Sequence, residues 1–270
     1  MKRKLPFILL SLVFASVAIF SGYKLRTGMM EYNAGKETYE QLQQFVSFHE
    51  DTKPDQEEPD VTAGQDPDHS EQTAPQESVG AGEKIVLPKV NFVALKAINE
   101  DVVGWIYQEG TTVNYPVVQG EDNHEYLYWL INGDYNGAGT PFMDFRNEPD
   151  FSDRNTVIYG HNMNNGTMFA DFHKYVDQEY YDEHPTMLLM TPDEDYTVEF
   201  FAGYISTLDT DAWQMQFSSD KEYTDWLETA KEKSAFKSNV VPTVDERVIT
   251  LSTCSNSYAK TRFVLLGVLR

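Results

Sequence analysis

The chain has a single cysteine, Cys254, among its 270 residues. One thiol cannot form a disulfide within the chain, so the fold must depend on an ordinary hydrophobic core. The sequence also lacks Cys-x-x-Cys, His-Glu-x-x-His and a phosphate-binding glycine loop, so it predicts neither a metal nor a cofactor. Lys and Arg number 21 against 43 acidic residues, a formal net charge of -22. This balance argues against nucleic-acid binding, which needs a basic surface.

Charge is also missing near the N-terminus. Residues 5–23 carry no charged side chain and are mostly Leu, Ile, Val, Phe and Ala. About 20 apolar residues match a bilayer as a helix, so we expect a transmembrane anchor. The alternative is a signal peptide cleaved after Ala15–Ala18, but its apolar core would cover only about 7–15 residues. Residues 1–4 are basic and predict a short cytoplasmic tail, a single pass and a domain outside the cell.

Two further segments precede the folded domain. Residues 24–49 predict a juxtamembrane amphipathic helix, with Tyr39, Leu42, Phe45 and Val46 at helical spacing. The sequence leaves open whether this helix packs on the domain or merely continues the anchor. Residues 50–87 are acidic, contain no aromatic side chain and predict an extended, disordered stalk. The folded domain is then predicted to cover residues 88–270.

Eight short runs rich in β-branched, aromatic and aliphatic residues predict strands in this domain. They cover residues 104–107, 112–118, 140–144, 156–160, 187–191, 196–206, 247–254 and 262–269. Asn91 is predicted to cap a short helix with Phe92, Leu95 and Ile98 on one face. A longer helix is expected over residues 220–236, with Ser218 or Ser219 as its cap. Eight strands with few helices predict a mainly β fold, either a barrel or a sandwich.

Cys254 closes one predicted strand, and Arg262 opens the next. A hairpin through residues 255–261 would bring the guanidinium group beside the sulfur. A neighbouring positive charge favours the thiolate, which is the reactive form of cysteine. The alternative is an inert, buried thiol that packs as a small hydrophobic group.

His161 directly follows the predicted strand 156–160 and precedes a polar loop. A histidine at this place is well positioned to exchange a proton with a substrate. Together with a thiolate at Cys254 and an oxyanion donor at Arg262, it would complete the groups needed for acyl transfer. Asp144, Asp150 and Asp153 could orient His161, although we interpret them as exposed loop residues.

Several segments resemble one family. Thr250–Cys254 followed by Arg262 is similar to the TLxTC and arginine motif of sortases, the membrane-anchored cysteine transpeptidases of Gram-positive bacteria. Further segments resemble class B members of that family: Val103–Ile106, Tyr115–Gly120, Asp122–Leu127, Tyr159–Met163 and Gly166–Phe169.

The resemblance implies a closed eight-stranded sortase barrel with the class B N-terminal helices and an added helix before the cysteine strand. It implies that Cys254 is the nucleophile, His161 the acid and base, and Arg262 the group that stabilises the oxyanion or the substrate. It also implies substrate contacts, which would be made by Asn123, Leu127, Tyr159 and Ser252.

The implied activity is that of a transpeptidase in the cysteine endopeptidase class. The enzyme would cleave a C-terminal sorting signal in exported proteins through a thioester, and would transfer the acyl group to an amine. That amine would belong to a cell-wall precursor or to a pilin lysine. Two alternatives stay open from the residues alone: a hydrolytic cysteine peptidase, and a non-catalytic surface protein tethered to the membrane.

Overall fold

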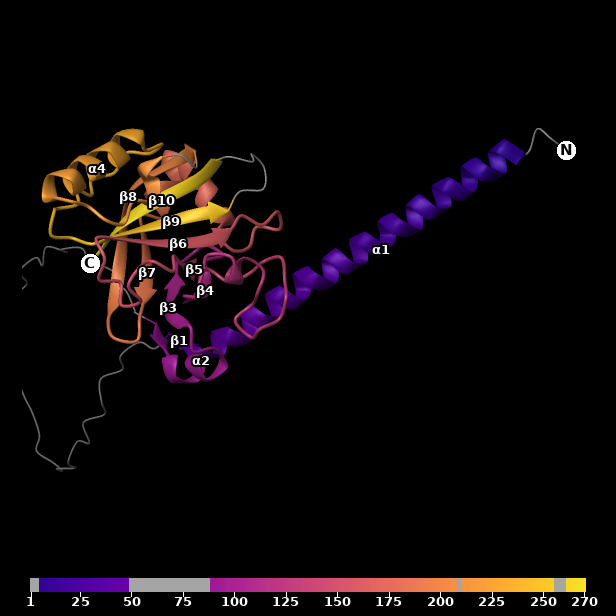
Figure 1. Cartoon of the computed structure of the whole chain (residues 1–270), viewed down its shortest axis with the longest axis horizontal. Helices are drawn as coiled ribbons and strands as arrows, with labels where there is room; N and C mark the ends of the chain where they lie inside the picture. The colour runs from indigo at the N-terminus through magenta and orange to yellow at the C-terminus, as the bar shows by residue number, and fades with distance from the viewer. Residues whose placement is uncertain (1–4, 49–87, 208–209, 255–260) are drawn as a thin grey trace, which may run out of the picture.

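A computed structural model describes residues 5–48, 88–207, 210–254 and 261–270, without the side chains of residues 5–11 and Cys254. Eight of its strands close into a barrel in the order β10-β8-β7-β3-β4-β5-β6-β9 (Figure 1). They are β3 (Val102–Tyr107), β4 (Asn114–Val118), β5 (Phe142–Met143), β6 (Asn155–His161), β7 (Thr186–Met190), β8 (Asp195–Thr207), β9 (Val248–Cys254) and β10 (Thr261–Leu269). The predicted eight-stranded barrel is confirmed, and each predicted run matches one strand to within two residues.

Alternation along the strands divides the core into two layers. On β10, Phe263 and Leu265 belong to the cluster inside the barrel, whereas Val264 and Leu266 belong to a second cluster on its outer face. This follows from the two-residue period of a strand, which sends successive side chains to opposite faces. The strands are therefore buried on both sides at this wall of the barrel.

Helix α4 (Asp220–Lys233) covers that outer wall. The hydroxyl of Ser219 accepts a hydrogen bond from the Glu222 amide, which confirms one of the two predicted caps. Its buried face consists of Tyr223, Trp226, Leu227 and Ala230. The helix ends at Lys233, three residues before the predicted end.

Smaller helical segments connect the strands. Asn91 caps α2 (Phe92–Ile98) as predicted, but Ile98 is 42% exposed and does not join the buried face. Helix α3 is short (Gln178–Glu183). The 3-10 helices are η1 (Gln43–Phe45), η2 (Glu125–Leu127), η3 (Ala170–Val176) and η4 (Asp211–Trp213).

The N-terminal helix α1 (Leu5–Leu42) projects far from the barrel and rests on it only by its C-terminal end (Figure 1). Tyr39 and Leu42 are buried there, so the predicted amphipathic segment both continues the N-terminal run and packs on the domain. Helix was predicted over residues 24–49, but α1 ends at Leu42, and after η1 the chain forms β1 (Val46–Ser47), which pairs with β2 (Lys89–Val90).

Parts of the predicted N-terminal organisation lie outside the described residues. These are the tail 1–4, the stalk over 50–87 and the side chains of the first seven residues of the predicted anchor. No helix in the described part of the chain combines the length and the apolarity needed to cross a membrane.

Candidate active site

Two strands from distant parts of the chain bring two of the predicted catalytic residues into register. Strand β6 pairs with β9 in parallel, so that His161 lies opposite Cys254 and Tyr159 lies opposite Ser252. Both strands are rich in β-branched and aliphatic residues, which suits strands that are buried on both faces. The barrel thus places His161 and Cys254 at the same end of neighbouring strands.

Arg262 comes from the third strand of this wall. Strand β10 pairs antiparallel with β9, with Val264 opposite Ser252. Arg262 precedes Val264 by two residues on β10, and Cys254 follows Ser252 by two residues on β9. In an antiparallel pair, this register extends to Arg262 beside Cys254. The loop over residues 255–260, where a hairpin was predicted, lies outside the described residues. Arg262 is half-buried, and its positive charge lowers the pKa of His161.

His161 is 8% exposed, and its hydrogen bond defines its tautomer. Its Nε2 lies 2.7 Å from the backbone oxygen of Leu127, in η2. A carbonyl oxygen can only accept, so Nε2 carries the hydrogen and Nδ1 has a free lone pair in the neutral ring. Nδ1 is buried without a hydrogen-bond partner among the described residues. The ring of Tyr128 packs 5.9 Å from the His161 ring, centroid to centroid.

Burial lowers the pKa of His161, and the charge of Arg262 lowers it further, whereas the hydrogen bond to Leu127 opposes these effects. We expect Arg262→Gln to raise this pKa, measured by NMR titration of the imidazole, because one of the two lowering causes is removed. His173 is the internal control, since burial alone lowers its pKa. An unchanged pKa of His161 would show that the two side chains do not interact.

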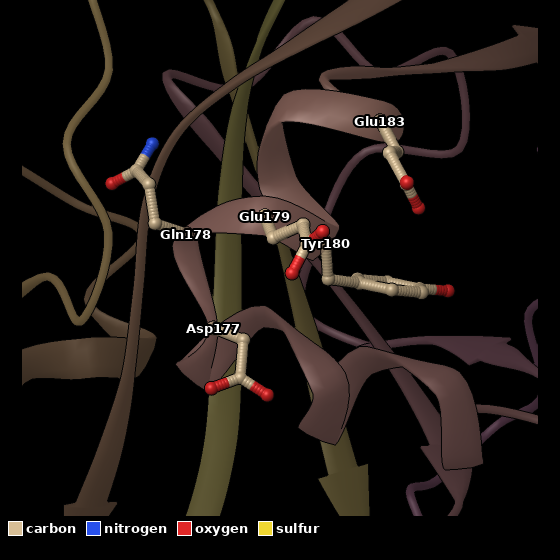
Figure 2. A pocket seen from close by; sticks show the side chains of 5 residues that line it. All are labelled: Asp177, Gln178, Glu179, Tyr180 and Glu183. Carbon is tan, nitrogen blue, oxygen red and sulfur yellow. The ribbon is translucent and has the colours of Figure 1, made fainter.

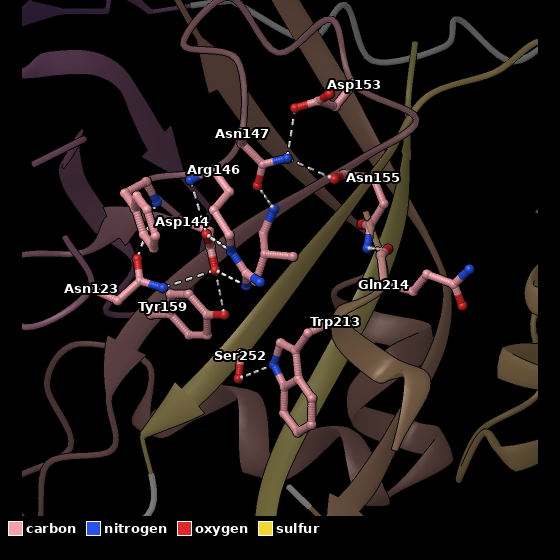
Figure 3. A network of polar contacts seen from close by, with 12 residues as sticks. Asn123, Asp144, Arg146, Asn147, Asp153, Asn155, Tyr159, Trp213, Gln214 and Ser252 are labelled. Atoms are coloured by element: carbon pink, nitrogen blue, oxygen red, sulfur yellow. Dashed lines mark hydrogen bonds and ion pairs between the residues drawn. The ribbon is translucent and has the colours of Figure 1, made fainter. Parts of the chain in front are cut away.

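A network around Asp144 holds two of the predicted substrate residues (Figure 3). The Asp144 side chain is fully buried. Its carboxylate accepts hydrogen bonds from Asn123 Nδ2 and from Tyr159 Oη, both at 2.9 Å. Arg146 adds two more, from Nε and Nη2, each at 2.8 Å. The buried Asp144 carboxylate therefore orients both Asn123 and Tyr159.

Ser252 and Leu127 are held by other partners. Trp213, in η4, donates from its indole Nε1 to the Ser252 hydroxyl at 3.0 Å, as Figure 3 shows. Close by, Asn155 Nδ2 donates to the Gln214 carbonyl at 2.8 Å. These bonds fasten the segment before α4 to β6 and β9. Leu127 contributes its backbone to His161, a contact that its side-chain type does not reveal.

Comparison with known proteins identifies the family. A sortase domain model matches residues 106–270. Sortase B of Listeria monocytogenes is 40% identical over 177 residues, 65% of this chain and 72% of that protein. Sortase B of Staphylococcus aureus is 32% identical over 261 residues, 97% of this chain and 93% of that protein. The chain belongs to the sortase B family.

The fold agrees with this assignment. The structure of a Staphylococcus aureus sortase B-substrate complex aligns with this chain at a TM-score of 0.64 and 36% identity, covering 66% of this chain and 84% of that one. The closed eight-stranded barrel is the shared element. This sortase is accordingly a cysteine transpeptidase, as the resemblance in its motifs implied.

The prediction that Asp144, Asp150 and Asp153 are exposed loop residues was wrong for Asp144 of this sortase. Asp150 is exposed, but Asp153 accepts a bond from the Asn147 side chain at 2.7 Å and Asp144 is buried. Among the described residues, no hydrogen bond or ion pair joins any of these three aspartates to His161. A usable signal was the Asp-x-Arg spacing of Asp144 and Arg146 at the end of a predicted strand.

We expect Asp144→Asn to destabilise the sortase by about 2–4 kcal/mol, because it leaves Arg146 without its buried anion. Burial alone would raise the pKa of Asp144, but bonds from Arg146, Asn123 and Tyr159 outweigh it and lower that pKa. Its stabilising effect is therefore present at neutral pH and is lost as the pH falls through the lowered value. Urea unfolding at several pH values measures this effect.

The control for this prediction is Asp150→Asn. Asp150 is exposed and accepts a bond from the Ser152 amide at 3.0 Å. Its replacement should change the free energy of unfolding by no more than about 0.5 kcal/mol. Equal effects of the two substitutions would contradict the role given to the buried carboxylate.

One surface depression lies apart from these residues. It has a volume of about 540 Å³ and is formed at α3 by Asp177, Gln178, Glu179, Tyr180 and Glu183 (Figure 2). Its lining contains none of the seven predicted site residues, and its charged groups are all carboxylates. We therefore place the candidate active site of the sortase at the ends of β6, β9 and β10.

Proposed function

We propose that this sortase cleaves a C-terminal sorting signal in exported proteins and transfers the new carboxyl end to an amine. Nδ1 of His161 would first take the proton of the Cys254 thiol, the resulting thiolate would attack the threonine carbonyl of the signal, and Arg262 would stabilise the oxyanion. As the carbon–nitrogen bond breaks, His161 would give its proton to the leaving amine. The product of this half-reaction is a thioester on Cys254.

The second half-reaction would run through the same groups. An incoming amine attacks the thioester carbon, His161 takes the amine proton, and the carbon–sulfur bond breaks to restore the thiolate. A proton on Nε2, held by Leu127, leaves Nδ1 as the atom that accepts and returns it. His161 gives up in each half-reaction the proton that it takes, to the leaving amine in the first and to the Cys254 sulfur in the second, so no further reactant is needed.

The observation that carries this proposal is the β-ladder register. It pairs His161 with Cys254, and on the adjacent strand it pairs Ser252 with Val264, two residues from Arg262. Family membership supports the same reading, because the three proposed catalytic residues lie in the matched range and in segments that resemble sortase motifs. The pKa of His161 is lowered by burial and also by the charge of Arg262, which supports the closeness of the two side chains.

Substrate contacts are proposed for Asn123, Leu127, Tyr159 and Ser252. Asp144 orients Asn123 and Tyr159, so these two side chains would meet a peptide without first having to be ordered. Ser252 is 1% exposed and bonded to Trp213, so a contact with substrate would require Trp213 to move. Sortase B of Staphylococcus aureus has been solved in complex with a substrate. This supports the proposal that the present sortase also binds a substrate.

We also propose that residues 5–23 anchor the enzyme in the membrane, with residues 1–4 inside the cell and residues 88–270 on its outer face. Support comes from the charge-free run and from large apolar side chains of α1, including Leu12, Phe14 and Phe20, that are more than half exposed. Residues 24–42 of α1 would then form the juxtamembrane helix, and residues 50–87 an acidic linker.

The test is a transfer assay with the full chain in detergent or nanodiscs. Peptides of the NPQTN and LPXTG types are incubated with and without an amine, and products are identified by mass spectrometry. One arm supplies a mimic of a cell-wall crossbridge amine, and the other a lysine-containing peptide that represents a pilin. The proposal predicts an amide adduct with one of them.

Two results would count against the proposal. Free acid as the sole product in every arm would identify a hydrolytic cysteine peptidase. No cleavage of any peptide, together with a thiol that resists alkylation in the native protein, would point to a non-catalytic surface protein.

A further inference from the structure

Helix α1 is joined to the loop of residues 128–140 by contacts spaced four residues apart. The Glu31 carboxylate accepts a hydrogen bond from the Gly137 amide at 2.7 Å, and the Glu31 carbonyl accepts one from Asn136 Nδ2 at 2.8 Å. Gly35 packs directly against the Asn136 side chain. Residues four apart lie on one face of a helix, so α1 presents a continuous contact surface to this loop.

Tyr39 completes this surface at the buried end. It is 5% exposed and packs edge-on against the Tyr115 ring, with centroids 5.2 Å apart. Its hydroxyl donates to the Gly139 carbonyl and lies 3.1 Å from Thr140 Oγ1. A buried hydroxyl with these partners fixes the position of the loop more strongly than an exposed contact.

The far side of the same loop rests on the backbone that binds His161. Gly139 has φ +59, and a Cβ there would lie 2.6 Å from the Leu127 carbonyl oxygen. The amide of Thr140 donates to the Tyr126 carbonyl at 3.0 Å, and that of Asn136 to the Tyr128 carbonyl at 2.8 Å. The loop therefore clamps the residues before and after Leu127.

We propose that α1 is a brace for the active site: Glu31 and Tyr39 hold the loop that aims the Leu127 carbonyl at His161 Nε2. They are positioning residues, since they act through Leu127 and not on a substrate. This inference rests on the proposed role of His161 in proton transfer. The helix that leads to the predicted anchor thereby determines which imidazole nitrogen keeps the hydrogen.

The physical basis is the small energy that separates the two tautomers of a neutral imidazole. The Leu127 carbonyl selects the form with hydrogen on Nε2 as long as it stays within hydrogen-bond distance. If the loop shifts away from α1, this selection weakens, and hydrogen on Nδ1 blocks the lone pair that the reaction needs. The rate of catalysis then falls although substrate binding is unchanged.

The test uses the full chain in nanodiscs with Tyr39→Phe, which removes one hydroxyl, and Glu31→Ala, which removes the acceptor of the Gly137 amide. The protein carries 15N-labelled histidine, and NMR reports the hydrogen on each nitrogen of His161. We expect the Nε2–H form to dominate in the wild type and to lose population in both variants. We also expect kcat to fall about threefold to tenfold with little change in KM, the size of one hydrogen bond.

Matched controls come from the same helix. Tyr23→Phe and Glu37→Ala make the same chemical changes at exposed positions of α1, where Tyr23 is 63% exposed and Glu37 accepts a bond from the exposed Gln41 at 3.5 Å. Both should leave the tautomer and kcat unchanged. If Tyr39→Phe loses the fold, as circular dichroism would reveal, Glu31→Ala decides the matter, because the bond that it removes is exposed.

A wild-type tautomer in Glu31→Ala and in folded Tyr39→Phe would overturn the inference. The NMR readout does not depend on turnover. An enzyme inactive on every peptide would therefore refute the proposed function, while the tautomer measurement would still decide whether α1 acts as a brace.

Discussion

Cys254→Ala is expected to lower kcat/KM for peptide cleavage by about 10⁴-fold or more, because no thioester can form without the sulfur. The remaining groups could still bind a peptide and polarise its carbonyl, but they would have no covalent route. Product formation measured by mass spectrometry over long incubations gives the size of the loss. Amine transfer by this variant at the wild-type rate would remove Cys254 from the mechanism.

Cys254→Ser separates nucleophilicity from shape. Serine retains a similar size, but its hydroxyl stays protonated at neutral pH, so it is a far weaker nucleophile than a thiolate. We expect this variant to recover little of the lost activity. Because the chain has one cysteine, alkylation of the wild-type protein offers a second control: activity should fall in proportion to the fraction of modified chains.

Much of the fold could be predicted because the signal for each strand is local. Runs such as Val248–Cys254 and Thr261–Leu269 are long, β-branched or aliphatic and bounded by polar segments. The end of α1 could not be predicted in the same way. Val46 lies at helical spacing with Tyr39 and Leu42, but it pairs with Val90. A pairing between segments so far apart in the sequence leaves no local signal.

The site shows a similar division. The adjacency of Cys254 and Arg262 follows from a predicted hairpin, since the two residues are close in sequence. The pairing of His161 with Cys254 joins strands more than 90 residues apart, and only the family resemblance indicated it. The Leu127 carbonyl and the buried Asp144 carboxylate were missed as organising groups, because a backbone acceptor has no residue type and burial depends on the tertiary fold.

Arg262→Gln is expected to reduce kcat/KM by about 10²–10³-fold, the usual cost of removing one oxyanion-stabilising group. Extended two residues past the Val264–Ser252 pair, the register leads to Arg262 beside Cys254, so its charge would favour both the thiolate and the oxyanion that develops from the substrate. Arg262→Lys should retain part of the activity, since it keeps the charge but loses the planar, two-pronged donor. Kinetics with one peptide and one amine compare the three proteins.

Arg270→Gln is the matched control, because it removes an equal charge just past the other end of β10. Arg270 bonds to Glu199 and, at 2.9 Å, to Glu246, so its loss should affect stability slightly and leave kcat/KM near the wild-type value. If Arg262→Gln were as active as Arg270→Gln, the positive charge of Arg262 would not matter for the reaction. At higher amine concentration the thioester reacts faster, so its formation limits the rate. A loss of activity in Arg262→Gln that grows with amine concentration would therefore show that Arg262 acts in thioester formation.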